Sequence, residues 1–253
     1  VVERARRALA GADAAKAIRL AREADQAAIA EAVRLNEEAE AVKAFVQRAK
    51  AIDYAALTRE AGRAFDELAA QVIAALRAVD EYVRFKTEAA SAQDKWLKAL
   101  YQADAERALR TVKTELELAR QIQRRAEEAL SRVREVEEIK PPRFADIDLS
   151  QDVKVQRSEF FLPEDAGLYA LAIAFAKRLD AVRRAAPEER RKAAAELAAV
   201  AELLREYPRD KVAKALEEST RPIFYKAGSV EIKTERAEKL LAALGYAALA
   251  ATG

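Results

Sequence analysis

The chain has 253 residues, 51% of them hydrophobic, and carries 45 Lys and Arg against 43 Asp and Glu, a net charge of +2. This near balance excludes the strongly basic surface expected of a protein that binds nucleic acid or anionic lipid. Because the chain has no Cys and no His, disulfides, Ser-His-Asp and Cys-His nucleophiles and histidine-liganded or cysteine-liganded zinc sites are also excluded.

The sequence has no segment that resembles a membrane span. The uncharged run at about residues 166–176, which reads as a buried helix, is far shorter than the roughly 20 residues needed to cross a bilayer. The first residues lack the apolar core and cleavage site of a secretory signal. We therefore expect a soluble protein, cytoplasmic if made in a cell, for which a membrane partner is disfavoured.

Residues 12–50 predict a first long helix, in which large apolar residues are sparse and alanine must supply much of the packing face. Asp53 opens a second helix, whose apolar residues recur every three or four positions and form one continuous stripe. The stripe consists of Phe65, Leu68, Val72, Leu76, Val79 and Val83.

A third helix is predicted from Ser91 to about residue 138, with Ser91 as N-cap and Asp94 as its acidic partner. One unbroken helix over 55–138 is the alternative. The apolar residues of this segment approach heptad spacing, so residues 1–140 predict a long three-helix antiparallel bundle or coiled coil. Trp96 and Tyr101 are expected to lie in the core at a helix junction.

Pro141 and Pro142 end the third helix, because proline lacks an amide donor and disfavours helix in the residue before it. Residues 141–253 predict a compact α+β part, with two or three short antiparallel strands within 152–161 and 222–234. The helices expected in this part cover about 164–185, 188–206, 209–218 and 235–250.

No motif for catalysis or cofactor binding is present. The chain has neither GxGxxG nor GxxxxGK[ST], and its adjacent carboxylates are typical of solvated helix faces. These are Glu37-Glu38, Glu127-Glu128, Glu137-Glu138 and Glu188-Glu189. We therefore predict that the chain is not an enzyme and that it binds no metal, cofactor or small-molecule ligand.

The composition resembles the output of computational sequence design, either de novo or on an existing backbone, and no natural family is recognised. His, Cys and Met are all absent, 62 residues are Ala, and PEERRKAAAELAAVAELLRE fills helical positions with strong helix formers. The resemblance implies a thermostable, alanine-rich helical bundle. A natural protein from a GC-rich or thermophilic source is the alternative, against which the absence of His argues.

Residues 150–163 interrupt the helical pattern without an evident local gain in stability, and such interruptions are typical of functional segments. An exposed edge strand there would recruit a protein by strand addition. The candidate partner-binding residues are Gln156, Arg157, Ser158, Phe160, Phe161, Phe224 and Tyr225.

The leading functional hypothesis is a non-catalytic structural or scaffold protein. The first alternative is a protein-binding module that presents residues 141–163 and 221–234 to a partner. The second is an α-helical pore-forming or membrane-remodelling protein, since long amphipathic hairpins with a small β insertion have that outline. Self-association through the helices is compatible with the first two hypotheses.

Overall fold

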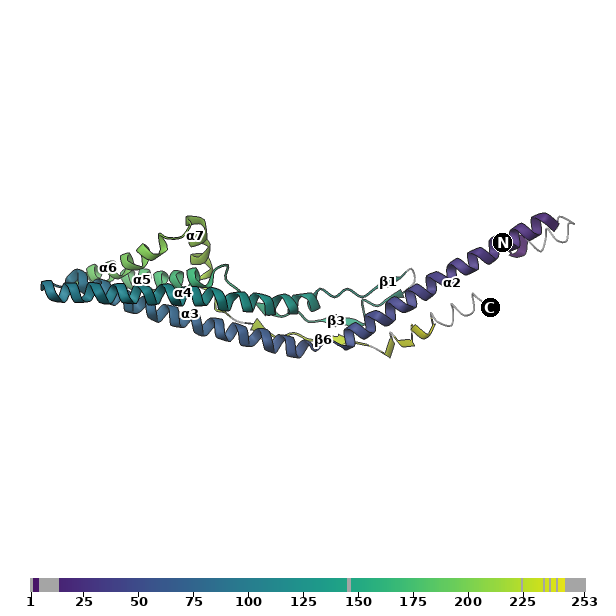
Figure 1. The fold of residues 1–253 in the computed structure, drawn as a ribbon, viewed down its shortest axis with the longest axis horizontal. Coiled ribbons are helices and arrows are strands. Elements are labelled where there is room, and N and C mark those ends of the chain that lie inside the picture. Colours follow the sequence, from purple (N-terminus) through teal and green to yellow (C-terminus); the bar gives the residue numbers. More distant parts are fainter. Residues whose placement is uncertain are drawn as a thin grey trace. The chain divides into compact units, whose positions relative to one another are not determined.

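The computed structural model describes residues 2–4, 14–144, 147–223, 225–233, 235–236, 238–239 and 241–243. Its helices are α2 (Ala14–Lys50), α3 (Tyr54–Ser91), α4 (Lys95–Glu137), α5 (Ala166–Arg184), α6 (Pro187–Leu204) and α7 (Arg209–Glu218). Its strands are β1 (Arg143–Phe144), β2 (Ile147–Asp148), β3 (Val153–Val155), β4 (Glu159–Phe160), β5 (Tyr225–Lys226) and β6 (Val230–Ile232). The predicted fold class, mostly α with a small α+β part, is confirmed (Figure 1).

The three long helices predicted before Pro141 are present. α2 corresponds to the helix predicted over 12–50, and α3 and α4 are separate helices with residues 92–94 between them. The alternative of one unbroken helix over 55–138 is therefore wrong.

The chain divides into two compact units, each assembled from distant parts of the sequence. Unit 1 contains Val1–Asp53, Glu137–Gln156 and Ser229–Gly253, and unit 2 contains Tyr54–Val136 and Arg157–Gly228. Each unit thus includes residues from both sides of the Pro141-Pro142 pair.

Unit 2 has one continuous apolar core between α3, α4, α5 and α6. α3 and α4 run side by side as the arms of a long hairpin (Figure 1), and the apolar stripe of each helix enters the core. Residues 166–172 at the start of α5 are all buried, as expected for a helix enclosed by its neighbours. The largest fully buried side chains of this core are Phe65, Leu68, Val79, Val83, Val112, Leu168, Leu171 and Val200.

Gly167 allows α5 to approach α4 closely. A Cβ atom at this position would lie 3.1 Å from the main-chain oxygen of Leu116 and 3.3 Å from Oδ1 of Asp165. The backbone oxygen cannot rotate away as a flexible side chain would. A side chain at position 167 therefore requires the backbone at Leu116 to move away by a few tenths of an ångström.

We expect Gly167→Val to destabilise the protein by about 1–3 kcal/mol, the usual cost of overpacking a close-packed interface. Ala181→Val is the matched control, because Ala181 is exposed on the same helix and its valine would meet no backbone. Denaturant unfolding followed by circular dichroism measures both. Equal midpoints for the two variants would contradict the close approach of α5 to α4.

A buried polar side chain of α4 fixes the turn that begins α5. Oε1 of Gln123 accepts a hydrogen bond from the Ala166 amide at 2.5 Å. Nε2 of Gln123 donates to the carbonyl oxygens of Pro163 and Glu164 at 2.9 and 3.0 Å. Asp165 then caps α5, its Oδ1 accepting from the Leu168 amide at 3.0 Å. One side chain of the hairpin thus sets where α5 starts.

The predicted antiparallel pairing is present, but as separate two-stranded ladders instead of one sheet. In unit 1, β3 pairs with β6, so that Val153 faces Ile232 in the ladder. In unit 2, β4 pairs with β5, so that Phe160 faces Tyr225. The pairing of β1 with β2 was not predicted from the sequence.

Small residues carry much of the packing of α2, as predicted. In unit 1 its buried Ala39, Val42 and Val46 pack with Leu149 in a small core. The larger Ile18, Ile29 and Val33 of the same helix are exposed. The described residues 235–236, 238–239 and 241–243 are helical, and the remainder of the helix predicted over 235–250 lies outside the described residues.

Candidate functional site

Local hydrogen bonds define the turn between α3 and α4. The name hairpin tip is used here for residues 91–101, which include this turn and the first residues of α4. Oγ of Ser91 donates to the carbonyl oxygens of Thr87 and Glu88 at 3.0 and 3.2 Å, so Ser91 belongs to the last turn of α3. Oδ1 of Asp94 accepts from the amides of Trp96 and Leu97 at 2.8 and 2.9 Å.

Asp94 is therefore the N-cap of α4, and the prediction that Ser91 has this role is wrong. Both residue types can cap a helix, and the spacing alone did not distinguish them. The cap at Asp94 fixes the direction in which the first turn of α4 leaves the hairpin.

The hairpin tip presents large apolar side chains to solvent. Every residue from 93 to 100 is exposed, and Trp96 is 86% exposed, Leu100 52% and Leu97 48%. Isolated exposed apolar residues are ordinary, but an indole beside two leucines on one helical turn forms an apolar patch. Lys95 and Lys98 are exposed on the same turn.

The prediction that Trp96 and Tyr101 lie in the core is wrong for Trp96, whereas Tyr101 is half-buried. The buried stripe of α4 begins only at Ala105. The first turn of α4 directly follows the turn at residues 92–94 and lies at the end of the hairpin, where residues 95–100 are exposed. Large apolar side chains are buried on average, but this preference does not determine at which residues a helical hairpin turns.

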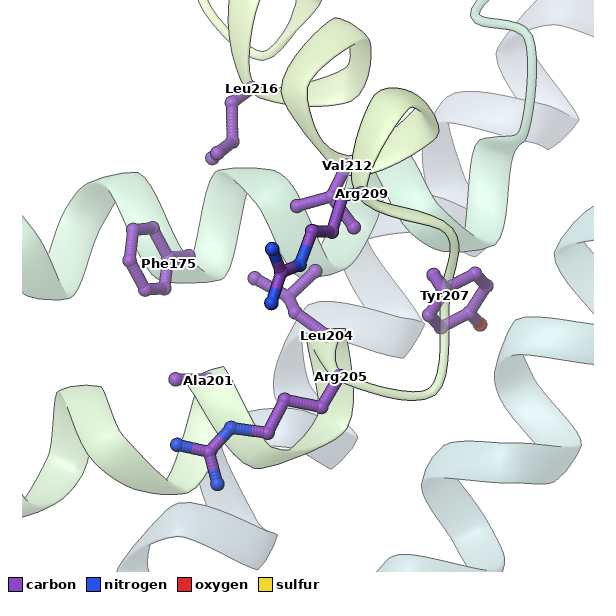
Figure 2. Close-up of a pocket in the computed structure, with 8 residues that line it drawn as sticks. All are labelled: Phe175, Ala201, Leu204, Arg205, Tyr207, Arg209, Val212 and Leu216. Atoms are coloured by element: carbon purple, nitrogen blue, oxygen red, sulfur yellow. The ribbon is translucent and has the colours of Figure 1, made fainter.

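A second candidate site is a pocket of about 400 Å³ between α5, α6 and α7, here called the α5–α7 pocket (Figure 2). Its apolar wall is formed by Phe175 from α5, Ala201 and Leu204 from α6, and Val212 and Leu216 from α7. Its volume lies within the roughly 300–1,000 Å³ of small-molecule pockets.

Two arginines flank this pocket. In Figure 2 the Arg209 side chain extends between Phe175 and Leu204, and Arg205 extends past Ala201. Among the described residues, neither guanidinium has an ion-pair partner within 4.0 Å. The pocket thus combines apolar walls with two available cations.

Tyr207 closes one side of the pocket and is held by α4. Nη2 of Arg120 donates to the Tyr207 hydroxyl at 3.3 Å, and the Arg120 guanidinium lies 5.6 Å from the centre of the ring. Arg120 also pairs with Asp165 at 3.1 Å, so one side chain links the start of α5 to the α6–α7 turn. Burial raises the pKa of the Tyr207 hydroxyl.

Stability is expected to fall in alkaline solution. Burial raises the pKa of Tyr207, and a hydrogen bond to Glu202 raises the pKa of Lys86. The folded chain then holds more protons than the unfolded chain above about pH 10, so the free energy of unfolding decreases as pH rises through that range. Denaturant midpoints measured across this range should decline less steeply for Tyr207→Phe. An identical decline in both proteins would refute the role of Tyr207.

The residues predicted for partner binding are divided between unit 1 and unit 2. Gln156 belongs to unit 1, where its amide donates to the Ser229 carbonyl at 2.6 Å. Arg157 is exposed in unit 2. Oγ of Ser158 lies 2.8 Å from the Tyr54 hydroxyl and accepts from the Gly228 amide at 3.2 Å.

The two phenylalanines of that prediction are partly buried against the core of unit 2. The Phe160 ring centre lies 4.9 Å from that of Phe65, and the Phe161 centre lies 6.1 Å from that of Tyr169. The Arg221 guanidinium lies 5.7 Å from the Phe161 centre.

β4 and β5 bring the backbones of Phe160 and Tyr225 together. Phe224 lies outside the described residues. Phe160 and Phe161 are partly buried, and β4 pairs with β5 in a two-stranded ladder, so the binding of a partner at this strand stays a prediction.

No helix within the described ranges is long and apolar enough to span a bilayer. Comparison with family models, curated proteins and solved structures found no match to this chain.

Proposed function

We propose that this chain is a non-catalytic helical scaffold that uses its hairpin tip to bind another protein. The observation that carries the proposal is the exposure of Trp96 beside Leu97 and Leu100 at the end of two long paired helices. Tryptophan is enriched among the few residues that dominate the energy of protein interfaces.

The scaffold role is supported by the interactions that join α3 to α4. Nε2 of Gln71 on α3 donates to the main-chain oxygen of Glu115 on α4 at 3.2 Å. Ion pairs between Arg125 and Glu67 and between Arg132 and Glu60 join the same two helices at 3.4 and 2.9 Å. Exposed pairs of this kind contribute about 0–1 kcal/mol each, so the apolar stripes supply most of the stability. A tip on a rigid support loses little conformational entropy when it binds.

Trp96 can be removed without loss of stability, because its side chain contacts little of the folded chain. We expect Trp96→Ser to change the free energy of unfolding by no more than about 0.5 kcal/mol, as for an ordinary surface substitution. Leu118→Ser is the matched control, since Leu118 is 39% exposed on the same helix outside the hairpin tip.

Binding is tested with a photo-crosslinking amino acid at Lys98, in cells that express the wild type, Trp96→Ser or Leu118→Ser. We expect one discrete crosslinked protein with the wild type and with Leu118→Ser, and its loss with Trp96→Ser. The identified protein, once purified, should shift the emission of Trp96 on mixing. Equal crosslinking of the Trp96→Ser variant would contradict the proposal.

We also propose that the sequence is a product of computational design. The absence of His, Cys and Met together with 62 Ala supports this origin. Thermal unfolding followed by circular dichroism tests the accompanying expectation of thermostability: a midpoint in the mesophile range of roughly 45–65 °C would contradict it.

A further inference from the structure

We propose that the α5–α7 pocket binds a small amphiphilic anion, a carboxylate with an unbranched apolar tail such as octanoate. The pocket uses other residues of unit 2 than the hairpin tip, so this inference is independent of the proposed function. It departs from the sequence-based prediction that the chain binds no small molecule, because the three helices that form the pocket meet only in the folded chain.

The pocket is apolar inside and basic at its edge. Leu204 is buried and Phe175 is half-buried, whereas Arg205 and Arg209 are exposed. A ligand that satisfies both surroundings has an apolar body and a negative charge at one end. The aliphatic stem of Arg209, which extends between Phe175 and Leu204 in Figure 2, would lie along the apolar tail and leave its guanidinium at the carboxylate.

The charge of these two arginines is left available by the neighbouring carboxylates of α6 and the turn that follows it. Glu202 pairs with Lys86 at 2.9 Å, and Glu206 pairs with Lys113 at 3.7 Å. The residues that line the pocket include no acidic side chain. Within the described ranges, neither pocket arginine has an ion-pair partner at 4.0 Å or less. A ligand carboxylate would therefore accept charge-assisted hydrogen bonds that no group of the chain now accepts.

The start of α7 adds to this preference for an anion. α7 begins at Arg209, and Pro208 before it supplies no side-chain cap, so the first amides of the helix form an uncompensated positive end. Asp210 in the same turn is exposed and does not line the pocket. The basic edge therefore keeps its positive potential.

The walls of the pocket are held in place before any ligand arrives. In the turn between α6 and α7, the Tyr207 amide donates to the Leu204 carbonyl at 3.2 Å, and the Val212 amide donates to the Pro208 carbonyl at 3.0 Å. Arg120 holds the Tyr207 side chain from α4. A preformed site loses little conformational entropy on binding, so even a small ligand keeps measurable affinity.

Isothermal titration calorimetry of the full chain tests the inference, with octanoate kept below the concentration at which it forms micelles. We expect saturable binding of a single octanoate per chain. Each buried methylene strengthens binding about fourfold, so hexanoate should bind on the order of tenfold more weakly. Octanol, which lacks the charge, should bind at least about tenfold more weakly, and acetate, which lacks the tail, should not bind detectably.

Variants of the pocket separate its basic edge from its apolar wall. Arg205→Gln with Arg209→Gln alters only exposed side chains and should weaken octanoate binding at least about tenfold while leaving octanol binding unchanged. Arg190→Gln with Arg191→Gln is the matched control, because both arginines are exposed at the start of α6 and do not line the pocket. Ala201→Phe fills the pocket and should abolish the binding of both ligands.

Three results of the titrations would overturn the inference. They are the absence of saturable octanoate binding by the wild type, equal affinities for octanoate and octanol, and equal octanoate affinities in the two arginine double variants. Methyl NMR spectra locate the bound tail, with shifts expected at Leu204, Val212 and Leu216. Shifts confined to Leu97 and Leu100 would mean that the exposed hairpin tip captures the tail, and would also overturn the inference.

Discussion

Replacement of Phe65 by alanine is expected to destabilise the protein by about 3–5 kcal/mol, the usual cost of removing a buried phenylalanine. Phe65 is 2% exposed on α3 and packs against Phe160 of β4. Its removal eliminates apolar contacts and leaves a cavity that the close-packed α3 and α4 cannot collapse to fill. Denaturant unfolding followed by circular dichroism measures the loss.

Ile73→Ala is the matched control for this substitution, because Ile73 is 50% exposed on the same helix. We expect its effect to stay below that of Phe65→Ala by at least about 2 kcal/mol. Hydrogen exchange should also accelerate at the amides of the β4–β5 ladder in Phe65→Ala, since Phe160 loses its support. Comparable losses in the two variants would place the core of unit 2 elsewhere.

Replacement of Gln123 by leucine is expected to cost about 2–4 kcal/mol, although leucine is apolar and similar in size. Gln123 is 4% exposed and satisfies the Ala166 amide and the Pro163 and Glu164 carbonyls. Leucine would leave these backbone groups without a hydrogen-bond partner. Each buried polar group without a partner lowers the free energy of unfolding by about 1–3 kcal/mol. Chemical denaturation measures the loss.

Gln102→Leu is the control here, because Gln102 is exposed on the same helix and the exchange of side chains is the same. In Gln123→Leu, hydrogen exchange should become faster at the amides of residues 164–168, where α5 begins. A loss below about 0.5 kcal/mol, the range of ordinary surface changes, would show that the turn forms without the glutamine.

The helical part of the fold was predictable because its signals are local and repeated. The stripe from Phe65 to Val83 fixed the inward face of α3, and the eleven uncharged residues from 166 identified a buried helix. Pro187 begins α6, in agreement with the preference of proline for the first helical turn.

Features that depend on distant residues were not predictable. Gln123 resembles the other polar residues of α4 in sequence, and only the arrival of residues 163–166 from another segment gives it a buried role. The α5–α7 pocket likewise requires three helices to meet. The strands are two or three residues long, too short for alternation to indicate their partners.

The exposed tip was missed for a related reason. Because large apolar side chains are buried on average, the sequence predicts Trp96 in the core. The surroundings of Trp96 depend instead on where the chain turns from α3 into α4. The signal available in the sequence was the cluster of Trp96, Leu97 and Leu100 immediately after an N-cap, together with Lys95 and Lys98 on the same turn.

The fluorescence of Trp96 in the dilute wild-type chain tests the central claim most directly, because no other tryptophan contributes to the signal. A side chain held in solvent at the end of the hairpin should emit at the wavelength of free tryptophan in water and be quenched efficiently by acrylamide. Emission shifted to the blue, with protection from acrylamide at the lowest concentration, would mean that the indole is already buried within its own chain and is not displayed for a partner.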